Sequence, residues 1–174
     1  MTAWGTRSTQ LTPSHPKYLP TSPTCFVCGE ENPCGLHARF HVEDDLVVLP
    51  LRPTEHHCGY PGVVHGGIIA AALDESMGWA AARALHRMCV TGELTVRYLK
   101  PLAPVHGLVV RAGVLKAGRR MVHTHARLED RDGICYARAE GKFLPLSVEE
   151  TLRVDGGMIY RGGEEKVFES LHGK

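Results

Sequence analysis

The feature that most constrains this chain is a helix-forming segment that opens with two glycines. Residues 66–85 begin Gly-Gly-Ile-Ile-Ala-Ala-Ala-Leu-Asp-Glu and contain no proline, which predicts one long helix starting just after His65. An interior glycine costs a helix about 1 kcal/mol relative to alanine. Because the first turn of a helix has unpaired N–H groups at the positive end of the dipole, bare backbone at Gly66 and Gly67 lets an oxyanion approach closely. The segment therefore favours an oxyanion site suited to acyl transfer.

The spacing of Gly67 and Asp74 adds a geometric constraint. Seven residues place the two on nearly the same helix face but about 10 Å apart along the axis. One carbonyl cannot contact both within one chain, whereas two antiparallel copies about a two-fold axis would bring Gly67 of one copy opposite Asp74 of the other. We therefore predict an active site shared between two subunits. On the helix alone, an alternative stays open: tight packing on a sheet, with Asp74 and Glu75 facing solvent.

Composition sets the class of protein. The chain has 174 residues, 43% of them hydrophobic and 22% charged, which predicts one globular domain. With a net charge of +1, neither nucleic acid nor a membrane surface is expected as a partner. No apolar run approaches the roughly 18 residues of a membrane span, and residues 1–10 lack the features of a secretory signal. We therefore predict a cytoplasmic protein whose six cysteines are reduced thiols.

Alternating apolar residues and turn residues predict an antiparallel α+β domain. Strands are expected at 36–41, 46–51, 93–99, 108–115, 121–129 and 134–143, with the helix after the second strand and a turn at Asp44-Asp45. In the last strand, Cys135, Ala137, Ala139 and Gly141 form a strip of small residues that seats a helix. The expected organisation is an N-terminal arm at 1–24, the domain at 25–150, and a polar tail at 151–174 with one short helix at 164–171.

Several motifs then occur in a specific order. They are Cys25-Phe-Val-Cys-Gly29 with Asn32-Pro33 and Gly35-Leu36, Gly59-Tyr-Pro-Gly-Val-Val-His-Gly-Gly67, Leu73-Asp74-Glu75 with Met77-Gly78, Val96-Arg-Tyr-Leu-Lys-Pro101, and Asp132-Gly133. Over roughly residues 25–145 the chain resembles the PaaI-like acyl-CoA thioesterases of hotdog fold. The resemblance implies a curved antiparallel sheet wrapped around one long central helix. It also implies a homodimer whose sheets join edge to edge, or a dimer of such dimers.

The resemblance also implies roles for the helix residues. The Gly67 N–H, with Gly66 beside it, would donate to the thioester carbonyl of an acyl-CoA. Asp74 stands at the position of the catalytic carboxylate and would act as general base or as nucleophile. His65 would orient the loop that enters the helix, by capping rather than as a base. Glu75 is the weaker carboxylate candidate because it lies about 100° around the helix from Asp74.

The loop before the helix departs from the family pattern. Some relatives carry Asn or Gln six residues before His65 to hold substrate or water, where this chain has Gly59, so we expect His57 or its neighbour His56 to take that role. Because coenzyme A carries phosphates, cationic residues are expected at the mouth of the pocket. The candidates near strand ends are Lys100, Arg119 and Arg120, with Lys116 nearby.

Two alternatives to hydrolysis remain at this point. One is a hotdog protein that binds acyl thioesters without turning them over. The other is a zinc-binding module built on Cys25, Cys28, Cys34 and His37, which would coexist with the hotdog domain. Hotdog dehydratase chemistry is excluded because Gly67 and Trp79 stand where its acid or histidine is needed. We predict no metal at the catalytic site and no cofactor, since coenzyme A is part of the substrate.

Overall fold

The computed structural model describes residues 16–173, so the first fifteen residues of the predicted arm and Lys174 lie outside the described part. The described elements are β1 (Lys17–Tyr18), β2 (His41–Glu43), β3 (Leu46–Leu51), η1 (Glu55–His57), β4 (Cys58–Tyr60), β5 (Val63–Val64), α1 (Gly66–Leu85), β6 (Cys89–Tyr98), β7 (Leu108–Ala117), β8 (Val122–Glu129), β9 (Cys135–Pro145), α2 (Val148–Asp155) and η2 (Glu169–Leu171). The predicted bounds of the long helix are confirmed.

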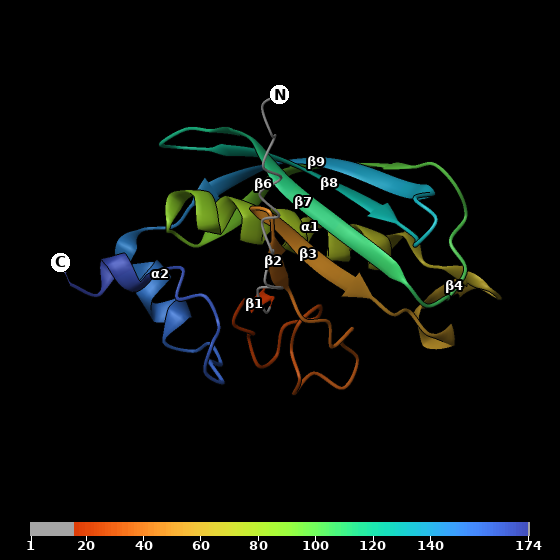
Figure 1. Ribbon diagram of the computed structural model, residues 1–174, viewed down its shortest axis with the longest axis horizontal. Helices are drawn as coiled ribbons and strands as arrows, with labels where there is room; N and C mark the ends of the chain where they lie inside the picture. Colours follow the sequence, from red (N-terminus) through yellow and green to blue (C-terminus); the bar gives the residue numbers. More distant parts are fainter. Residues whose placement is uncertain (1–15, 174) are drawn as a thin grey trace, which may run out of the picture.

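One curved antiparallel sheet holds α1 against one of its faces (Figure 1). Its strand order is β1-β2-β3-β7-β8-β9-β6, so β6 forms one edge. Along β8 the residues alternate, with Thr124 and Ala126 buried under α1 and His125 pointing the other way. This alternation gives the sheet an apolar inner face and a polar outer face. The α+β hotdog architecture is confirmed.

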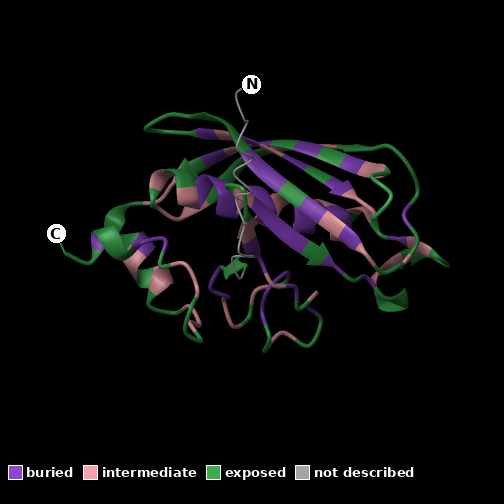
Figure 2. Cartoon of the chain, viewed as in Figure 1, coloured by how far each residue is buried: buried purple, intermediate pink, exposed green. Residues whose placement is uncertain are grey.

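The small-residue strip of β9 is confirmed as the seat of α1. Ala137 and Ala139 are buried, and a Cβ added at Gly141 would lie 3.3 Å from Cε of Met77 on α1 and 2.6 Å from the ring of Phe143. A larger side chain at Gly141 would therefore push the helix away from the sheet. Buried residues concentrate where the sheet meets α1 (Figure 2).

The strand predicted at 36–41 is wrong, because β2 begins only at His41. His37 has a positive φ of 48°, which breaks an extended conformation, and the N–H groups of Leu36 and Ala38 donate to carbonyls of the N-terminal loop instead. The predicted turn is confirmed: Asp44 and Asp45 have φ angles of 45° and 65°, the left-handed pair that a two-residue hairpin requires.

Residues 19–40 and 148–171 cover the side of α1 away from the sheet (Figure 1). Trp79 on α1 contacts Phe40 from the N-terminal side and stacks on Phe168 from the C-terminal side, with ring centroids 6.5 Å apart in both pairs. Val167 and Phe168 are buried in the same core. The segment predicted as a polar tail thus contributes apolar side chains to the domain.

The C-terminal helix lies earlier than predicted. α2 starts after Ser147, whose side chain accepts from the Glu150 N–H while the Glu150 carboxylate accepts from the Ser147 N–H. The short helix predicted at 164–171 is wrong, since only the single 3₁₀ turn η2 occurs there. The predicted domain boundary at 150 falls within α2.

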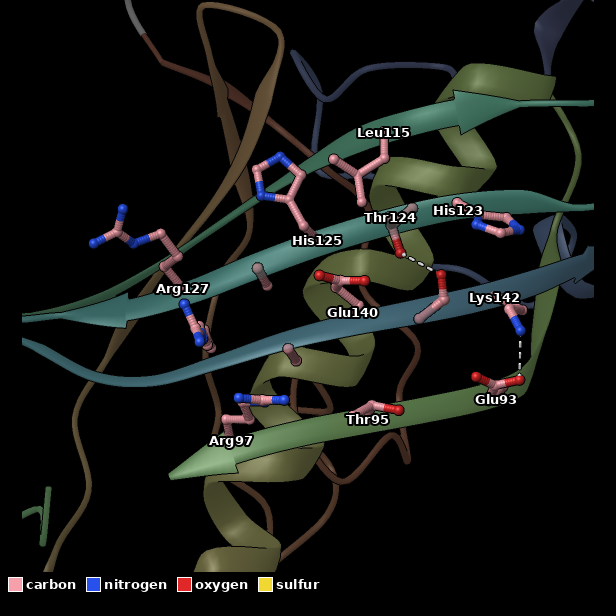
Figure 3. A pocket seen from close by; sticks show the side chains of 14 residues that line it. Glu93, Thr95, Arg97, Leu115, His123, Thr124, His125, Arg127, Glu140 and Lys142 are labelled. Carbon is pink, nitrogen blue, oxygen red and sulfur yellow. Dashed lines mark hydrogen bonds and ion pairs between the residues drawn. The ribbon is translucent and has the colours of Figure 1, made fainter. Parts of the chain in front are cut away.

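The outer face of the sheet carries mainly polar side chains (Figure 3). His123, His125 and Arg127 of β8 line a shallow hollow of about 530 Å³ there, beside the Lys142–Glu93 ion pair, with N and O 2.7 Å apart. The two histidines therefore point away from α1. Among residues 16–173, no helix is both long enough and apolar enough to cross a bilayer.

Candidate functional site

His65 caps the start of α1. Its backbone is extended, and its imidazole Nδ1 accepts the Gly67 N–H at 2.8 Å. The predicted capping role of His65 is confirmed. The Gly67 N–H is consequently engaged in this structure rather than free for a ligand, whereas the Gly66 N–H has no acceptor within residues 16–173. Both Gly67 and His65 are exposed.

A cavity of about 600 Å³ opens beside this helix start. Gly59, His65, Gly66 and Lys100 all line it, so three predicted site residues and one predicted cation share a pocket. Tyr98 of β6 donates its hydroxyl to the Gly66 carbonyl at 2.8 Å, which ties the helix start to the edge strand.

Gly59 has a steric reason for lacking a side chain. A Cβ at this position would lie 3.0 Å from Cδ2 of His65. A side chain at position 59 would therefore require the imidazole cap of α1 to shift by a few tenths of an ångström. Glycine at this position leaves room for the capping histidine.

His57 forms hydrogen bonds with the backbone of the loop before α1. Its Nδ1 accepts the Thr54 N–H at 2.9 Å, and its carbonyl accepts the His65 N–H at 2.8 Å. Burial lowers the pKa of His57, so its imidazole is neutral at pH 7. His57 thus holds the segment that delivers His65, and it does not line the cavity at the helix start.

The arginine candidates are not brought to this cavity. Arg119 and Arg120 follow β7 in the hairpin to β8, at the end of the sheet opposite the start of α1 (Figure 1). Of the four predicted cations, which include Lys116, only Lys100 lines the pocket beside the helix start. The sequence showed that these cations lie near strand ends, but it did not show which end of the sheet each of them occupies.

Asp74 lies farther along α1 and faces a second cavity, of about 320 Å³. The Thr91 hydroxyl on β6 donates to both Asp74 carboxylate oxygens, at 2.9 and 3.2 Å. Burial raises the pKa of Asp74, and the Thr91 hydrogen bond partly offsets that effect. The result is an oriented carboxylate that is more basic than an exposed aspartate.

Glu75 lines the same cavity but has a different partner. The Cys25 thiol from the N-terminal loop donates to Glu75 Oε2 at 2.8 Å. Burial, followed by the nearby Cys25, raises the pKa of Glu75 to about 8. Asp74 and Glu75 therefore contact different partners, Thr91 and Cys25. This agrees with the 100° angle between successive residues around a helix. The Cys25–Glu75 contact was missed because it joins residues fifty positions apart.

The predicted zinc ligand set does not assemble. Within residues 16–173, the metal-compatible group contains Cys25, Cys28 and Glu75, with ligand atoms within 4.8 Å of one another. Cys34 is exposed in a neighbouring turn, and His37 lies beyond it in a left-handed conformation. Chain order suggested these two as ligands, but neither belongs to the metal-compatible group among residues 16–173.

The helix-start cavity and the Asp74 cavity have no lining residue in common. Within one chain, the start of α1 and the Asp74 carboxylate therefore lie in different cavities. Gly67, Ala71, Asp74 and Gly78 form a stripe along one face of α1, and all four are at least partly exposed. Neither of the two cavities holds both the helix start and Asp74.

Comparison with known proteins identifies the family. Residues 61–137 match the family model described as the Thioesterase superfamily. The chain is 34% identical over 107 residues to "Putative esterase SSO2140" of Saccharolobus solfataricus, covering 61% of this chain and 76% of that protein. It is 32% identical to the mouse acyl-coenzyme A thioesterase THEM5, covering 64% of this chain and 45% of that protein.

A solved structure gives the same result. The protein BH2602 from Bacillus halodurans, determined with CoA, superposes with a TM-score of 0.59 at 25% sequence identity, covering 64% of this chain and 76% of that chain. The shared fold places the long helix and sheet in the same relation, so the sequence resemblance is confirmed. The chain belongs to the thioesterase superfamily and has the hotdog fold.

Proposed function

We propose that this protein hydrolyses acyl-CoA thioesters at a site built by two subunits, with Asp74 of one subunit facing the helix start of the other. The observation that carries the proposal is the split site: an oriented carboxylate and a glycine-rich helix start on one exposed face of α1, in separate cavities. The relatives support the substrate class, because one is named an acyl-coenzyme A thioesterase and one was solved with CoA.

The edge strand β6 supports a dimer. It pairs only with β9 within the described chain, and Val90, Tyr98 and Leu99 along or just beyond it are 48–51% exposed. An unpaired edge strand is a template for pairing with another strand. Edge-to-edge pairing of two β6 strands would continue the sheet and bring the exposed α1 faces together. The resulting homodimer, or dimer of dimers, would complete the split site.

The chemistry follows from the two halves. The Asp74 carboxylate, held by Thr91, would take a proton from water as the water attacks the thioester carbonyl, or would attack the carbonyl itself. The start of the partner α1 would stabilise the oxyanion, with the carbonyl replacing His65 Nδ1 as acceptor of the Gly67 N–H and with the Gly66 N–H beside it. Collapse of the intermediate releases the coenzyme A thiolate, and Lys100 would contact its phosphates.

The cavity beside Asp74 is suited to the acyl group. Most of its lining is apolar, with Trp79, Met88 and Phe143 among the residues, and α2 closes one side through Val154. At about 320 Å³ it is at the lower end of the range for small-molecule pockets. We propose a short-chain, medium-chain or aryl group, because a long acyl chain would extend beyond this volume.

A second candidate is an acyl-thioester-binding protein without turnover. The observation favouring it is the engaged Gly67 N–H, which His65 holds at 2.8 Å. If the cap never opens, the strongest oxyanion donor stays occupied and Asp74 has a structural role. Turnover measurements distinguish the two candidates.

The first experiment measures thiol release from short, medium, long and aryl acyl-CoAs by the native protein and by Asp74→Asn. We expect hydrolysis of short to medium or aryl substrates and a loss of at least about a hundredfold in kcat for the variant, with an unchanged oligomeric state. Asp132→Asn, at an exposed aspartate in the turn before β9, is the matched control. Binding without hydrolysis would favour the second candidate, and an active Asp74→Asn would reject the assigned carboxylate.

A mixed dimer tests whether two subunits share the site. One chain carries Asp74→Asn and the other carries Gly67→Pro, which removes the amide donor. The His65 imidazole must move in that variant, because a Cβ at Gly67 would lie 2.9 Å from its Nδ1. If the site is shared, the co-expressed mixed dimer has one intact site and recovers about half of the native activity. If each chain holds its own site, the mixed dimer is as inactive as either parent.

A further inference from the structure

Cys25, Cys28 and Glu75 form a compact cluster beside the proposed active site. Their ligand atoms, two thiol sulfurs and a carboxylate oxygen, lie within 4.8 Å of one another. The cysteines come from the N-terminal loop and the glutamate from the middle of α1, so the cluster joins two segments distant in sequence. The proposed hydrolysis uses none of the three groups.

The loop that carries the cysteines is shaped around the Cys25 sulfur. The Val27 and Cys28 N–H groups point to Cys25 Sγ, at 3.2 and 3.5 Å. The Gly29 N–H donates to the Cys25 carbonyl at 2.9 Å, and a Cβ on Gly29 would come within 2.4 Å of that oxygen. Amide donors aimed at a sulfur favour its thiolate form, which is the form that binds metals. The tight turn presents both sulfurs to the same space.

Glu75 lacks a cationic partner within residues 16–173. No ion pair among these residues involves Glu75, and its carboxylate accepts a hydrogen bond from the Cys25 thiol. A mostly buried carboxylate is costly unless it is neutralised or paired with a positive charge. A divalent cation placed between this oxygen and the two sulfurs would supply that charge.

The donor set selects the kind of ion. Two thiolates and one carboxylate suit zinc, which takes sulfur at about 2.3 Å and oxygen at about 2.0–2.2 Å. Magnesium and calcium prefer oxygen ligands throughout. We propose that Cys25, Cys28 and Glu75 bind one Zn²⁺ ion, with its fourth position open to the cavity that Asp74 lines.

Such an ion would tie the N-terminal loop to α1 at the residue following Asp74. Ser22, Cys25 and Cys28 form the loop side of the Asp74 cavity, so the ion would hold that wall in place. The expected consequence is a more stable domain and a better-defined acyl pocket. Because the metal content is measured directly, this proposal can be tested whether or not the protein hydrolyses acyl-CoA.

The test uses the full chain, purified without added metal or chelator, and elemental analysis of zinc. We expect about one zinc per chain in the native protein and in the controls Cys34→Ser, outside the cluster, and Cys89→Ser, in the same cavity. Cys28→Ser should lose the metal, and Glu75→Gln should bind it at least about tenfold more weakly. Chelation should lower the thermal midpoint of the native protein and leave that of Cys28→Ser unchanged.

A spectroscopic measurement covers the case in which a variant folds poorly. Co²⁺ added to the chelator-treated native protein should give thiolate-to-metal charge-transfer bands that Zn²⁺ abolishes and that persist in Cys34→Ser. Absence of zinc and of these bands in the native protein overturns the proposal. A Cys25–Cys28 disulfide in protein kept under a thiol reductant, detected as a mass two hydrogens lower, overturns it as well.

Discussion

Removing the Phe168 ring is expected to destabilise the whole domain. The side chain is fully buried and stacks on Trp79 of α1 with an interplanar angle of 25°. Truncating a core phenylalanine to alanine costs about 3–5 kcal/mol, to which loss of the aromatic pair contributes about 0.5–1.5 kcal/mol. We expect Phe168→Ala to lower the free energy of unfolding by about 4 kcal/mol. For a chain of this length that corresponds to a fall of about 8–16 °C in Tm.

The assay is urea unfolding followed by tryptophan fluorescence, at one fixed protein concentration so that subunit association does not change the comparison. The midpoint should shift while the m-value stays constant. Lys166→Ala is the control in the same segment, because its side chain is 69% exposed and its pairing with Glu169 is at the surface. A loss below about 1 kcal/mol for Phe168→Ala would refute the packing of the C-terminal segment against α1.

Two further predictions concern α2 and the Asp74 partner. Hydrogen bonds from Ser147 lower the pKa of Glu150, so its stabilising contribution is present above its ordinary pKa of 4.5 and is lost as pH falls through the lowered value. Thermal midpoints of native protein and Glu150→Gln should therefore differ at pH 7 and converge in acid; a constant difference would contradict this. Thr91→Val removes the donor to Asp74, and we expect about a tenfold lower kcat with little change in KM, whereas an unchanged kcat would exclude an orienting role.

Local patterns predicted the central part of the fold well. The run from Gly66 to Leu85 forms the helix with its predicted ends, and His65 caps it. The Asp44-Asp45 turn and the small residues of β9 also hold their predicted places. In each case the outcome depends on residues within about four positions along the chain, or on a simple period of two. Such signals can be interpreted without knowledge of the rest of the molecule.

The predictions that failed depend on longer-range contacts. The strand expected at 36–41 is replaced by a loop bonded to the N-terminal turn. Residues 151–174 were expected to form a polar tail, yet Phe168 reaches the core through contact with Trp79. One local signal was overlooked: Ser147-Val-Glu-Glu150 is a capping box that marks the start of α2.

The candidate site likewise combines features that follow from local sequence with features that depend on long-range contacts. The sequence by itself determined the glycine-rich helix start, the seven-residue spacing to Asp74 and the expected need for a second subunit, because helix geometry converts spacing directly into direction and distance. The tertiary structure alone decided that Thr91 orients Asp74 and that Glu75 meets Cys25 and Cys28. The first contact depends on where β6 lies beside α1. The second depends on a loop fifty residues away packing against α1, which local periodicity does not encode.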